Sequence, residues 1–277
     1  MATEPAHGPV GGSPVMASLA VGRPVLSLGV RFSRSPDIAR MAAAAGYGVL
    51  WIDLEHSGMP IDCACQIAAT GHDLGLASWV RVPERELGVI GRLLDGGATG
   101  IIVPKIETVE EAREVARFCR FPPAGARSQI AQLPQFGFRR MAPSELTERS
   151  NAATVVQILI ESAAGIANAD AIASVPGVNL LGIGMNDLTA DLGCPGDPQD
   201  PRALEACRTV AAAAARHGKL AVVGGVGDAE RFAAVLALGF APLIFAAIDT
   251  ELLAGGLAQR ADSWRGRLAP SPDRTHP

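Results

Sequence analysis

The chain has 277 residues, a formal net charge of −4, 48% hydrophobic residues and 19% charged residues. This composition is typical of a globular protein and carries too little charge for intrinsic disorder. The weakly acidic balance and the lack of a basic run argue against nucleic acid or a membrane surface as a partner. No apolar stretch approaches about 18 residues and the first residues do not resemble a signal peptide, so we expect a cytoplasmic protein.

The five cysteines are an odd count and are too sparse for a disulfide scaffold. Cys63 and Cys65 could form a metal or redox pair, but they lie in a helical pattern, where residues two positions apart point to different sides. We therefore expect small buried thiols in a reducing compartment.

One unit recurs along the chain: a short apolar run followed by a helical pattern. The first run, Val25–Val30, precedes Ser35 as a helix N-cap, Pro36 at the first helical position and an alanine-rich helix that ends at Gly46. Further apolar runs are predicted as strands, at 48–53, 78–82, 100–104, 155–161, 179–184, 220–224 and 242–246. Helical patterns lie between them, near 61–73, 86–96, 108–119, 163–174, 201–217 and 228–238.

Strands this uniformly apolar are covered on both faces, as parallel strands are. Eight of them in about 250 residues favour a single-domain (β/α)8 TIM barrel over an open sheet. A doubly wound sheet normally carries G-x-G-x-x-G after its first strand, which the residues after Gly29 do not supply. We place the barrel at 13–268, between loose ends at 1–12 and 269–277. The segment 121–154 is too long for an ordinary loop, so we expect a lid or an interface element there.

Ionisable side chains gather where the predicted strands end, and in a TIM barrel the carboxyl ends of the strands carry the chemistry. They are Asp53, Glu55 and His56 after the second strand, Arg81 in the third, Glu161 in the fifth and Asp187 just after the sixth. So many charges on one rim indicate a ligand or metal ion that balances them.

Glu161 and Asp187 lie at the ends of neighbouring strands, so both carboxylates can reach a common point. Two carboxylates without a nearby cysteine or second histidine suit a hard divalent ion whose other ligands are water or substrate oxygens. The alternative is structural, because carboxylates at the start of a helix interact favourably with its free amides.

His56 is the only histidine at the carboxyl end of a predicted strand. A lone histidine is often structural, but the adjacent acids Asp53 and Glu55 can orient the ring and adjust its pKa for acid–base catalysis. Arg81 is either an ion-pair partner at the rim or a fixed cation for a carboxylate or an enolate oxygen.

Two glycine turns lie at the same end of the predicted barrel. Gly184, Met185, Asn186 and Asp187 lead into a short helix whose free amides could hold a carboxylate. The turn at 224–227 follows the seventh strand and could hold a phosphate in the same way, although a tight turn explains its glycines equally well.

The stretches that carry these residues resemble the HpcH/HpaI family of metal-dependent, class II pyruvate aldolases, which act on 4-hydroxy-2-oxo acids. They are WIDLEHSGM at 51–59, VRVPE at 80–84, RLLDGGATGIIVPKIETVEEA at 92–112, RFPPAGARS at 120–128, VVQILIESAAGIANADAIASVPGV at 155–178 and GIGMNDLTADLG at 182–193. Their order and spacing match the family through nearly all of the predicted barrel.

The resemblance implies a metal and substrate site. Glu161 and Asp187 would bind a divalent ion, Mg, Mn or Co, which would chelate pyruvate through its carboxylate and keto oxygens. Backbone amides at 185–187 would hold the substrate carboxylate. Many members have Gly-Pro-Ala-Asp where this chain has GMND at 184–187, a difference that would alter the pocket beside the carboxylate.

The resemblance also implies acid–base machinery. His56, paired with Asp95, would act through a water molecule that Asp53 helps to order, and Arg81 would stabilise the enolate oxygen. Retro-aldol cleavage needs a base for the C4 hydroxyl proton and a sink for the released electrons, which a metal ion with an arginine provides. The loop at 128–140 departs from the family pattern, so the aldehyde acceptor cannot be carried over.

The implied protein is a homo-oligomer, commonly a hexamer, whose C-terminal helix packs on a neighbouring subunit. In this chain that helix would lie at about 249–267. The implied partners are small molecules: pyruvate, or a close analogue such as hydroxypyruvate, and an aldehyde.

Three alternatives stay open from the sequence. A Schiff-base, class I aldolase needs a lysine in the pocket, and of the two lysines only Lys105 is placed for it, because Lys219 falls at the opposite end of the barrel. A CoA-ester lyase of the citrate-lyase or malyl-CoA type shares the barrel but would carry basic contacts for the CoA phosphates. A non-catalytic ligand-binding barrel would have no reason to retain the rim residues.

Overall fold

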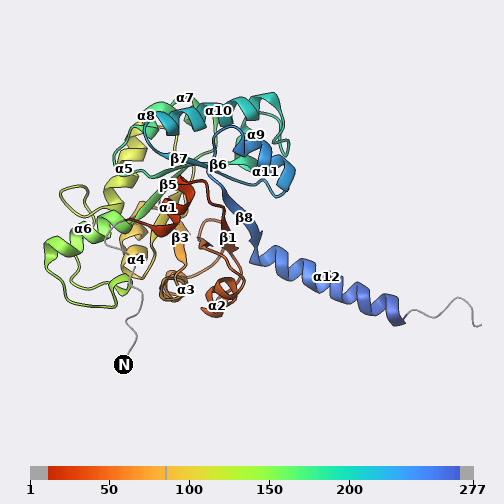
Figure 1. The fold of residues 1–277 in the computed structure, drawn as a ribbon, viewed down its shortest axis with the longest axis horizontal. Helices are drawn as coiled ribbons and strands as arrows, with labels where there is room; N and C mark the ends of the chain where they lie inside the picture. Colours follow the sequence, from red (N-terminus) through yellow and green to blue (C-terminus); the bar gives the residue numbers. More distant parts are fainter. Residues whose placement is uncertain (1–11, 85, 269–277) are drawn as a thin grey trace, which may run out of the picture.

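The computed structural model describes residues 12–84 and 86–268, and its centre is a sheet of parallel strands (Figure 1). The strands are β1 (Val25–Val30), β2 (Val49–Asp53), β3 (Ala77–Arg81), β4 (Gly100–Val103), β5 (Val155–Ile160), β6 (Leu180–Gly184), β7 (Leu220–Gly224) and β8 (Leu243–Ile248). They pair in the order β7-β6-β5-β4-β3-β2-β1-β8. The two end strands approach where the Ala241 amide, just before β8, donates a hydrogen bond to the Ala221 carbonyl oxygen at 2.8 Å. The sheet is therefore a nearly closed TIM barrel, as predicted.

Helices follow the strands and lie around the sheet (Figure 1). They are α1 (Pro14–Ala20), α2 (Asp37–Ala44), α3 (Ile61–Asp73), η1 (Leu87–Val89), α4 (Ile90–Asp95), α5 (Val109–Cys119), η2 (Pro134–Phe136), α6 (Pro143–Ala153), α7 (Ala163–Ala167), α8 (Ala169–Ala173), α9 (Met185–Asp191), α10 (Pro201–Arg216), α11 (Ala229–Leu236) and α12 (Asp249–Leu268). The strands and helices predicted from the sequence are present, and most of their ends shift by only one or two residues.

Three predicted features differ in detail. The helix expected at 163–174 is divided at Asn168 into α7 and α8. Helix α2 begins at Asp37 with Pro36 at the N-cap, and the Ser35 hydroxyl accepts a hydrogen bond from the Asp37 amide at 3.2 Å. The segment 121–154 is not one loop, because it contains η2 and α6. Of the ends expected to be loose, 1–11 and 269–277 lie outside the described residues.

Alternation along the strands decides which side chains face the barrel interior. Val49 in β2 and Trp79 in β3 belong to an interior apolar cluster, whereas Leu50 belongs to the layer between the sheet and the helices. Residues an even number of positions apart in a strand point to the same side. Asp53 comes four residues after Val49, and Arg81 comes two residues after Trp79, so both face the interior of the barrel. The fold therefore sets both charged side chains inside the barrel, at its carboxyl end.

Helix α1, which is absent from the predicted elements, packs at the other end of the barrel. Its Val15 and Leu19 are buried and join the interior cluster together with Val49 and Leu180, at the starts of β2 and β6. The amino end of the barrel is thereby covered by apolar side chains, and the carboxyl end is left for chemistry.

Helix α12 extends away from the barrel (Figure 1) and coincides with the C-terminal helix expected from the sequence. Its Leu252, Leu253, Leu257 and Trp264 are between 49% and 64% exposed. These large apolar side chains therefore have little cover from the described part of the chain. Neither α12 nor any other helix in the described ranges is long and apolar enough to cross a membrane.

All five cysteines are free thiols, and all except Cys65 are buried. Burial raises the pKa of Cys119 to about 12 and that of Cys207 to about 11. Thiols with raised pKa values form little thiolate, so these side chains act as small apolar groups, as the sequence predicts.

Candidate active site

A network of charged side chains fills the carboxyl end of the barrel around Asp53. Arg81 donates from Nε to Asp53 Oδ1 at 3.0 Å and from Nη2 to Oδ2 at 2.7 Å, and Arg31 Nε donates to Oδ2 at 2.9 Å. Burial by itself raises the pKa of Asp53, but the hydrogen bonds and charge of Arg81, with help from the His56 amide and Arg31, lower it overall. Asp53 is therefore an anion that fixes two arginines.

Glu55 and His56 extend this network to the mouth of the barrel. Arg81 Nη1 lies 2.8 Å from Glu55 Oε2, and His56 Nε2 lies 3.6 Å from the same oxygen. The His56 side chain is 53% exposed, so its ring can meet a molecule that enters from solvent. The Arg81 guanidinium carbon is also 4.5 Å from the centroid of the Trp51 ring, which supports its face. Asp53, His56 and Arg81 thus lie in one network.

Glu161 and Asp187 lie on the same rim, after the neighbouring strands β5 and β6. Glu161 comes directly after β5 and is buried, and Asp187 lies in the first turn of α9 after β6. The Lys105 amide donates to Glu161 Oε2 at 3.2 Å. Burial, together with the negative charge of nearby Asp187, raises the pKa of Glu161 to about 7. The negative charge of Asp187 therefore opposes ionisation of Glu161, and a bound cation would offset that effect.

The surroundings of Glu161 suit a cation. Gly184 leaves room for the carboxylate, because a Cβ at that position would collide with Glu161 Oε1. In the described ranges no group of three or more His, Cys, Asp or Glu side chains forms a ligand set. Two carboxylates with open coordination positions fit a hard divalent ion that completes its shell with water or substrate oxygens.

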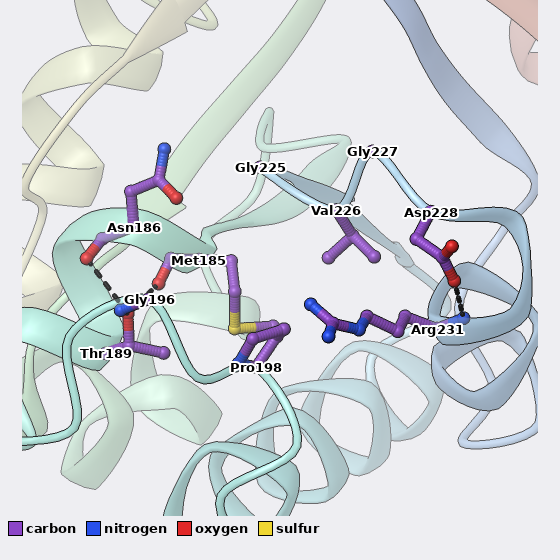
Figure 2. A pocket seen from close by; sticks show the side chains of 10 residues that line it. All are labelled: Met185, Asn186, Thr189, Gly196, Pro198, Gly225, Val226, Gly227, Asp228 and Arg231. Carbon is purple, nitrogen blue, oxygen red and sulfur yellow. Dashed lines mark hydrogen bonds between the residues drawn. The ribbon is translucent and has the colours of Figure 1, made fainter.

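The first turn of α9 has a second face, turned away from Asp187. Met185 and Thr189 are four residues apart and share that face, whereas Asp187 lies on the opposite side of the helix. Met185, Asn186 and Thr189 line a cavity of about 80 Å³ between α9 and the loop after β7 (Figure 2). The substrate-binding turn predicted from the sequence therefore separates this cavity from the Glu161 carboxylate.

The glycine turn at 224–227 forms the other wall of the cavity. Gly225 has a φ of +81°, and a Cβ there would lie 3.3 Å from Asn186 Oδ1, so glycine permits a close approach of the two loops. The Asp228 carboxylate accepts a hydrogen bond from the Arg231 amide at 2.9 Å and caps α11. An anion already occupies the start of α11, which disfavours a phosphate there. The Arg231 side chain points into the cavity (Figure 2).

Asp95 lies apart from the other predicted site residues. It ends α4, immediately before the turn that leads into β4, so it is at the amino end of the barrel. Arg127 Nη2 donates to Asp95 Oδ1 at 2.7 Å, and the Arg127 guanidinium packs over the Phe121 ring at 4.3 Å. Within this chain Asp95 and His56 are therefore at opposite ends, and the pairing implied by the resemblance is not formed.

The two lysines also lie at opposite ends. Lys105 Nζ is 3.3 Å from Glu84 Oε2, and the hydrogen bond and charge of Glu84 raise the pKa of this lysine. Lys219 precedes β7 and donates to the Val178 carbonyl oxygen at 2.6 Å. Schiff-base formation needs a neutral amine, so a raised pKa at Lys105 disfavours the class I alternative.

Two residues of the site are missing from the sequence prediction. Arg31, which contacts Asp53, directly follows β1, so the rule that selected Arg81 at the end of its strand applies to it equally. Asp249 follows β8, and its carboxylate accepts hydrogen bonds from the backbone amides of Arg31, Phe32 and Ser33 at 2.7 to 3.1 Å. It holds the loop that presents Arg31.

The sequence and the fold of this chain have counterparts in known proteins. Residues 32–247 match the family model described as HpcH/HpaI aldolase/citrate lyase. The chain belongs to this family. The resemblance predicted from the sequence is thereby confirmed, and the relatives named as aldolases confirm the predicted aldolase activity.

Individual members of the HpcH/HpaI family match over most of their length. The chain is 40% identical to the 4-hydroxy-4-methyl-2-oxoglutarate aldolase of Chaetomium globosum over 214 residues. These residues cover 76% of this chain and 80% of that protein. It is 35% identical over 235 residues to the 4-hydroxy-2-oxovalerate aldolase of Rhodococcus jostii, covering 83% and 85% of the two chains. The crystal structure of an HpcH/HpaI aldolase from Desulfitobacterium hafniense matches with a TM-score of 0.83 and 25% identity, over 92% of this chain and 97% of that one.

Proposed function

We propose that this HpcH/HpaI protein cleaves 4-hydroxy-2-oxo acids reversibly to pyruvate, or hydroxypyruvate, and an aldehyde or second 2-oxo acid. Its cofactor would be a divalent ion, Mg, Mn or Co. The observation that carries the proposal is the pair of carboxylates, Glu161 and Asp187, on the same rim as the Asp53–Arg81 network. The substrates named for two relatives, 4-hydroxy-4-methyl-2-oxoglutarate and 4-hydroxy-2-oxovalerate, share the 4-hydroxy-2-oxo acid unit.

Glu161 and Asp187 would hold the ion, which when bound polarises the keto group of the substrate as a Lewis acid. The backbone amides at 185–187, at the start of α9, would hold the substrate carboxylate. Both contacts concern the pyruvate half of the substrate, so they would be common to every acceptor.

Arg81 would stabilise the negative charge that develops on the C2 oxygen as the C3–C4 bond breaks. Of its five N–H groups, Asp53 and Glu55 engage three, which leaves two for the substrate. Because these acids fix the guanidinium in advance, little reorganisation accompanies the reaction. His56, exposed at the mouth beside Glu55, would accept the C4 hydroxyl proton directly or through water.

We further propose that the protein is a homo-oligomer, with the hexamer of the resemblance as the expected form. Asp95 can pair with His56 only if a second copy of the chain brings its amino end to this rim, because the two residues of one chain lie at opposite ends. The exposed leucines and Trp264 of α12 are an apolar surface that a neighbouring copy would cover.

The test is release of pyruvate from a racemic 4-hydroxy-2-oxo acid by EDTA-treated protein, repeated after addition of Mn²⁺ or Mg²⁺. We expect turnover only with metal, and we expect Glu161→Gln and Asp187→Asn to lose both Mn²⁺ binding and turnover. Glu114→Gln, on the exposed face of α5, is the matched control. Metal binding that is unchanged in both site variants would remove these carboxylates from the metal site. Metal-independent turnover that borohydride traps would point to Lys105.

A further inference from the structure

The cations at the catalytic rim differ in how firmly they are held. Arg31 and Arg81 both bind Asp53, whose side chain is only 1% exposed. The ammonium of Lys105 instead lies 3.3 Å from Glu84, and the two side chains are 48% and 42% exposed. An ion pair exposed to this degree contributes little, because water solvates both charges. Lys105 can therefore exchange Glu84 for an incoming anion far more readily than either arginine can leave Asp53.

The backbone at Lys105 brings the side chain close to the candidate metal site. Lys105 follows β4 with a φ of +52°, in the left-handed region that few residues other than glycine adopt. In this conformation its amide donates to Glu161 Oε2 while its side chain reaches Glu84 beyond β3. The ammonium is also near enough to Asp187 and Glu55 for their charges to act on it. A strained conformation retained beside a reactive site is a reason to look for a role.

We propose that Lys105 binds the carboxylate at the acceptor end of 4-hydroxy-2-oxo dicarboxylates, and so gives the enzyme a preference for substrates with a second negative charge. The proposal rests on the proposed aldolase function. With the first carboxylate of the substrate at the α9 amides, its C4 substituents extend across the rim. A second carboxylate there approaches the negative side chains of Glu55 and Glu84, and a cation is needed to offset that repulsion. Lys105, whose ammonium lies 3.3 Å from Glu84, supplies it.

Arg231 is another exposed cation near this rim, and its position is less suitable. It lines the cavity of Figure 2 together with Met185 and Thr189, on the face of α9 turned away from Asp187. A substrate held by Glu161 and Asp187 lies on the Lys105 side of that helix. Arg231 therefore serves as a matched control, because its removal deletes one exposed positive charge at the same end of the barrel.

The experiment compares two substrates with the full-length, Mn²⁺-loaded protein. One is 4-hydroxy-4-methyl-2-oxoglutarate, which has the second carboxylate, and the other is 4-hydroxy-2-oxovalerate, which lacks it. The readout is the ratio of the two kcat/KM values in Lys105→Met, Lys105→Arg and Arg231→Met. We expect the ratio to fall about 10- to 100-fold in Lys105→Met, mainly through KM, because one charged hydrogen bond is lost. We expect Lys105→Arg to retain most of the ratio and Arg231→Met to stay within about threefold of the unaltered protein.

Other results would overturn the proposal in distinguishable ways. Equal losses on both substrates in Lys105→Met would mean that the residue acts through Glu161, and Mn²⁺ affinity would fall in parallel. An unchanged ratio would remove Lys105 from acceptor recognition, and a selective loss in Arg231→Met would transfer the carboxylate to the cavity. If the unaltered protein cleaves neither substrate, the proposed function itself fails, whereas a loss confined to the Lys105 variants leaves that function intact.

Discussion

Arg81 holds Asp53 through two separate hydrogen bonds, from Nε to Oδ1 at 3.0 Å and from Nη2 to Oδ2 at 2.7 Å. Both side chains are almost fully buried, so each charge is balanced by the other rather than by water. Two parallel bonds also fix the plane of the guanidinium, which a single contact would leave free to turn. The pair is therefore a rigid donor at the point where we expect substrate charge to develop.

Arg81→Lys keeps the positive charge but cannot make both bonds to Asp53. We expect kcat/KM for a 4-hydroxy-2-oxo acid to fall by about 10²- to 10³-fold, the usual loss when a fixed donor to a developing oxyanion is removed. Steady-state kinetics with saturating Mn²⁺ measures this. Arg31→Lys, which alters a single bond from a partly exposed arginine, is the control and should lose much less. Similar losses in the two variants would mean that any disturbance of the Asp53 network has this effect, and not the loss of the paired bonds from Arg81.

Gly184→Ala tests the packing of the candidate metal site without replacing either of the proposed metal ligands. Its Cβ would collide with the Glu161 carboxylate, which must then rotate or shift. We expect Mn²⁺ affinity, measured by calorimetry, to fall by about 10- to 100-fold, as it does when the support of a metal ligand is lost. Gly58→Ala is the control, because a Cβ at that position on the β2 side of the rim meets nothing within 4 Å. Unchanged affinity in Gly184→Ala would argue that Glu161 does not bind the ion.

Asp249 gives the fold a defined dependence on pH. Burial by itself raises the pKa of Asp249, but the amides of Ser33, Arg31 and Phe32 lower it below the ordinary 3.8. Because the folded-state pKa is the lower one, this carboxylate stabilises the protein above about pH 4, and that stability is lost as the pH falls through the folded-state pKa.

Asp249→Asn should therefore lower the free energy of unfolding by about 1–2 kcal/mol at pH 7, and the difference from the unaltered protein should shrink below pH 3.8. Urea unfolding at neutral and at acidic pH checks both expectations. Asp262→Asn, which breaks an exposed pair with Arg265, is the control and should have little effect. A difference of the same size at both pH values would mean that packing, and not the charge, is responsible.

The separation of His56 from Asp95 predicts complementation between inactive chains. His56→Ala and Asp95→Ala should each lose about 10²- to 10⁴-fold in turnover. If neighbouring copies share each site, a mixed oligomer restores up to about one quarter of the sites, because one copy supplies His56 and another Asp95. Pyruvate release after subunit exchange measures the recovery, and size-exclusion chromatography shows whether mixed oligomers formed. Mixed oligomers without recovery would argue against a shared site.

The barrel was predictable because its strands carry a strong local signal. β1 and β7 have the predicted bounds, since polar or turn-forming residues flank their apolar runs, such as Pro24 before β1 and Gly225 after β7. Helix α6 has no such signal: its sequence, PSELTERSNAA, is polar, and only Leu146 and Ser150 are buried. Helix α1 is short, and it buries Val15 and Leu19 only because the barrel interior lies beside it. Helices that are stabilised by contacts with distant parts of the chain show little hydrophobic periodicity in their own sequence.

In the candidate site, too, residues placed by local signals could be predicted, whereas contacts with distant segments could not. Asp53 and Arg81 could be selected because strand ends and side-chain alternation place them without knowledge of the loops. The partner of Asp95 could not be found, since Arg127 lies 32 residues away in an irregular segment. The contact between the Lys105 amide and Glu161 depends on a positive φ that no lysine would be expected to adopt.

The incomplete closure of the barrel sets where it should loosen first. β7 and β8 end the strand order, and in the described ranges no ladder joins them, so each has backbone groups without a strand partner on one side. Strands β4 and β5 are paired on both sides and fully buried. In a hydrogen–deuterium exchange experiment, amides of β8 should therefore take up deuterium well before those of β5. Local opening would begin beside Asp249 and Arg31, while the carboxylate that follows β5 would stay protected.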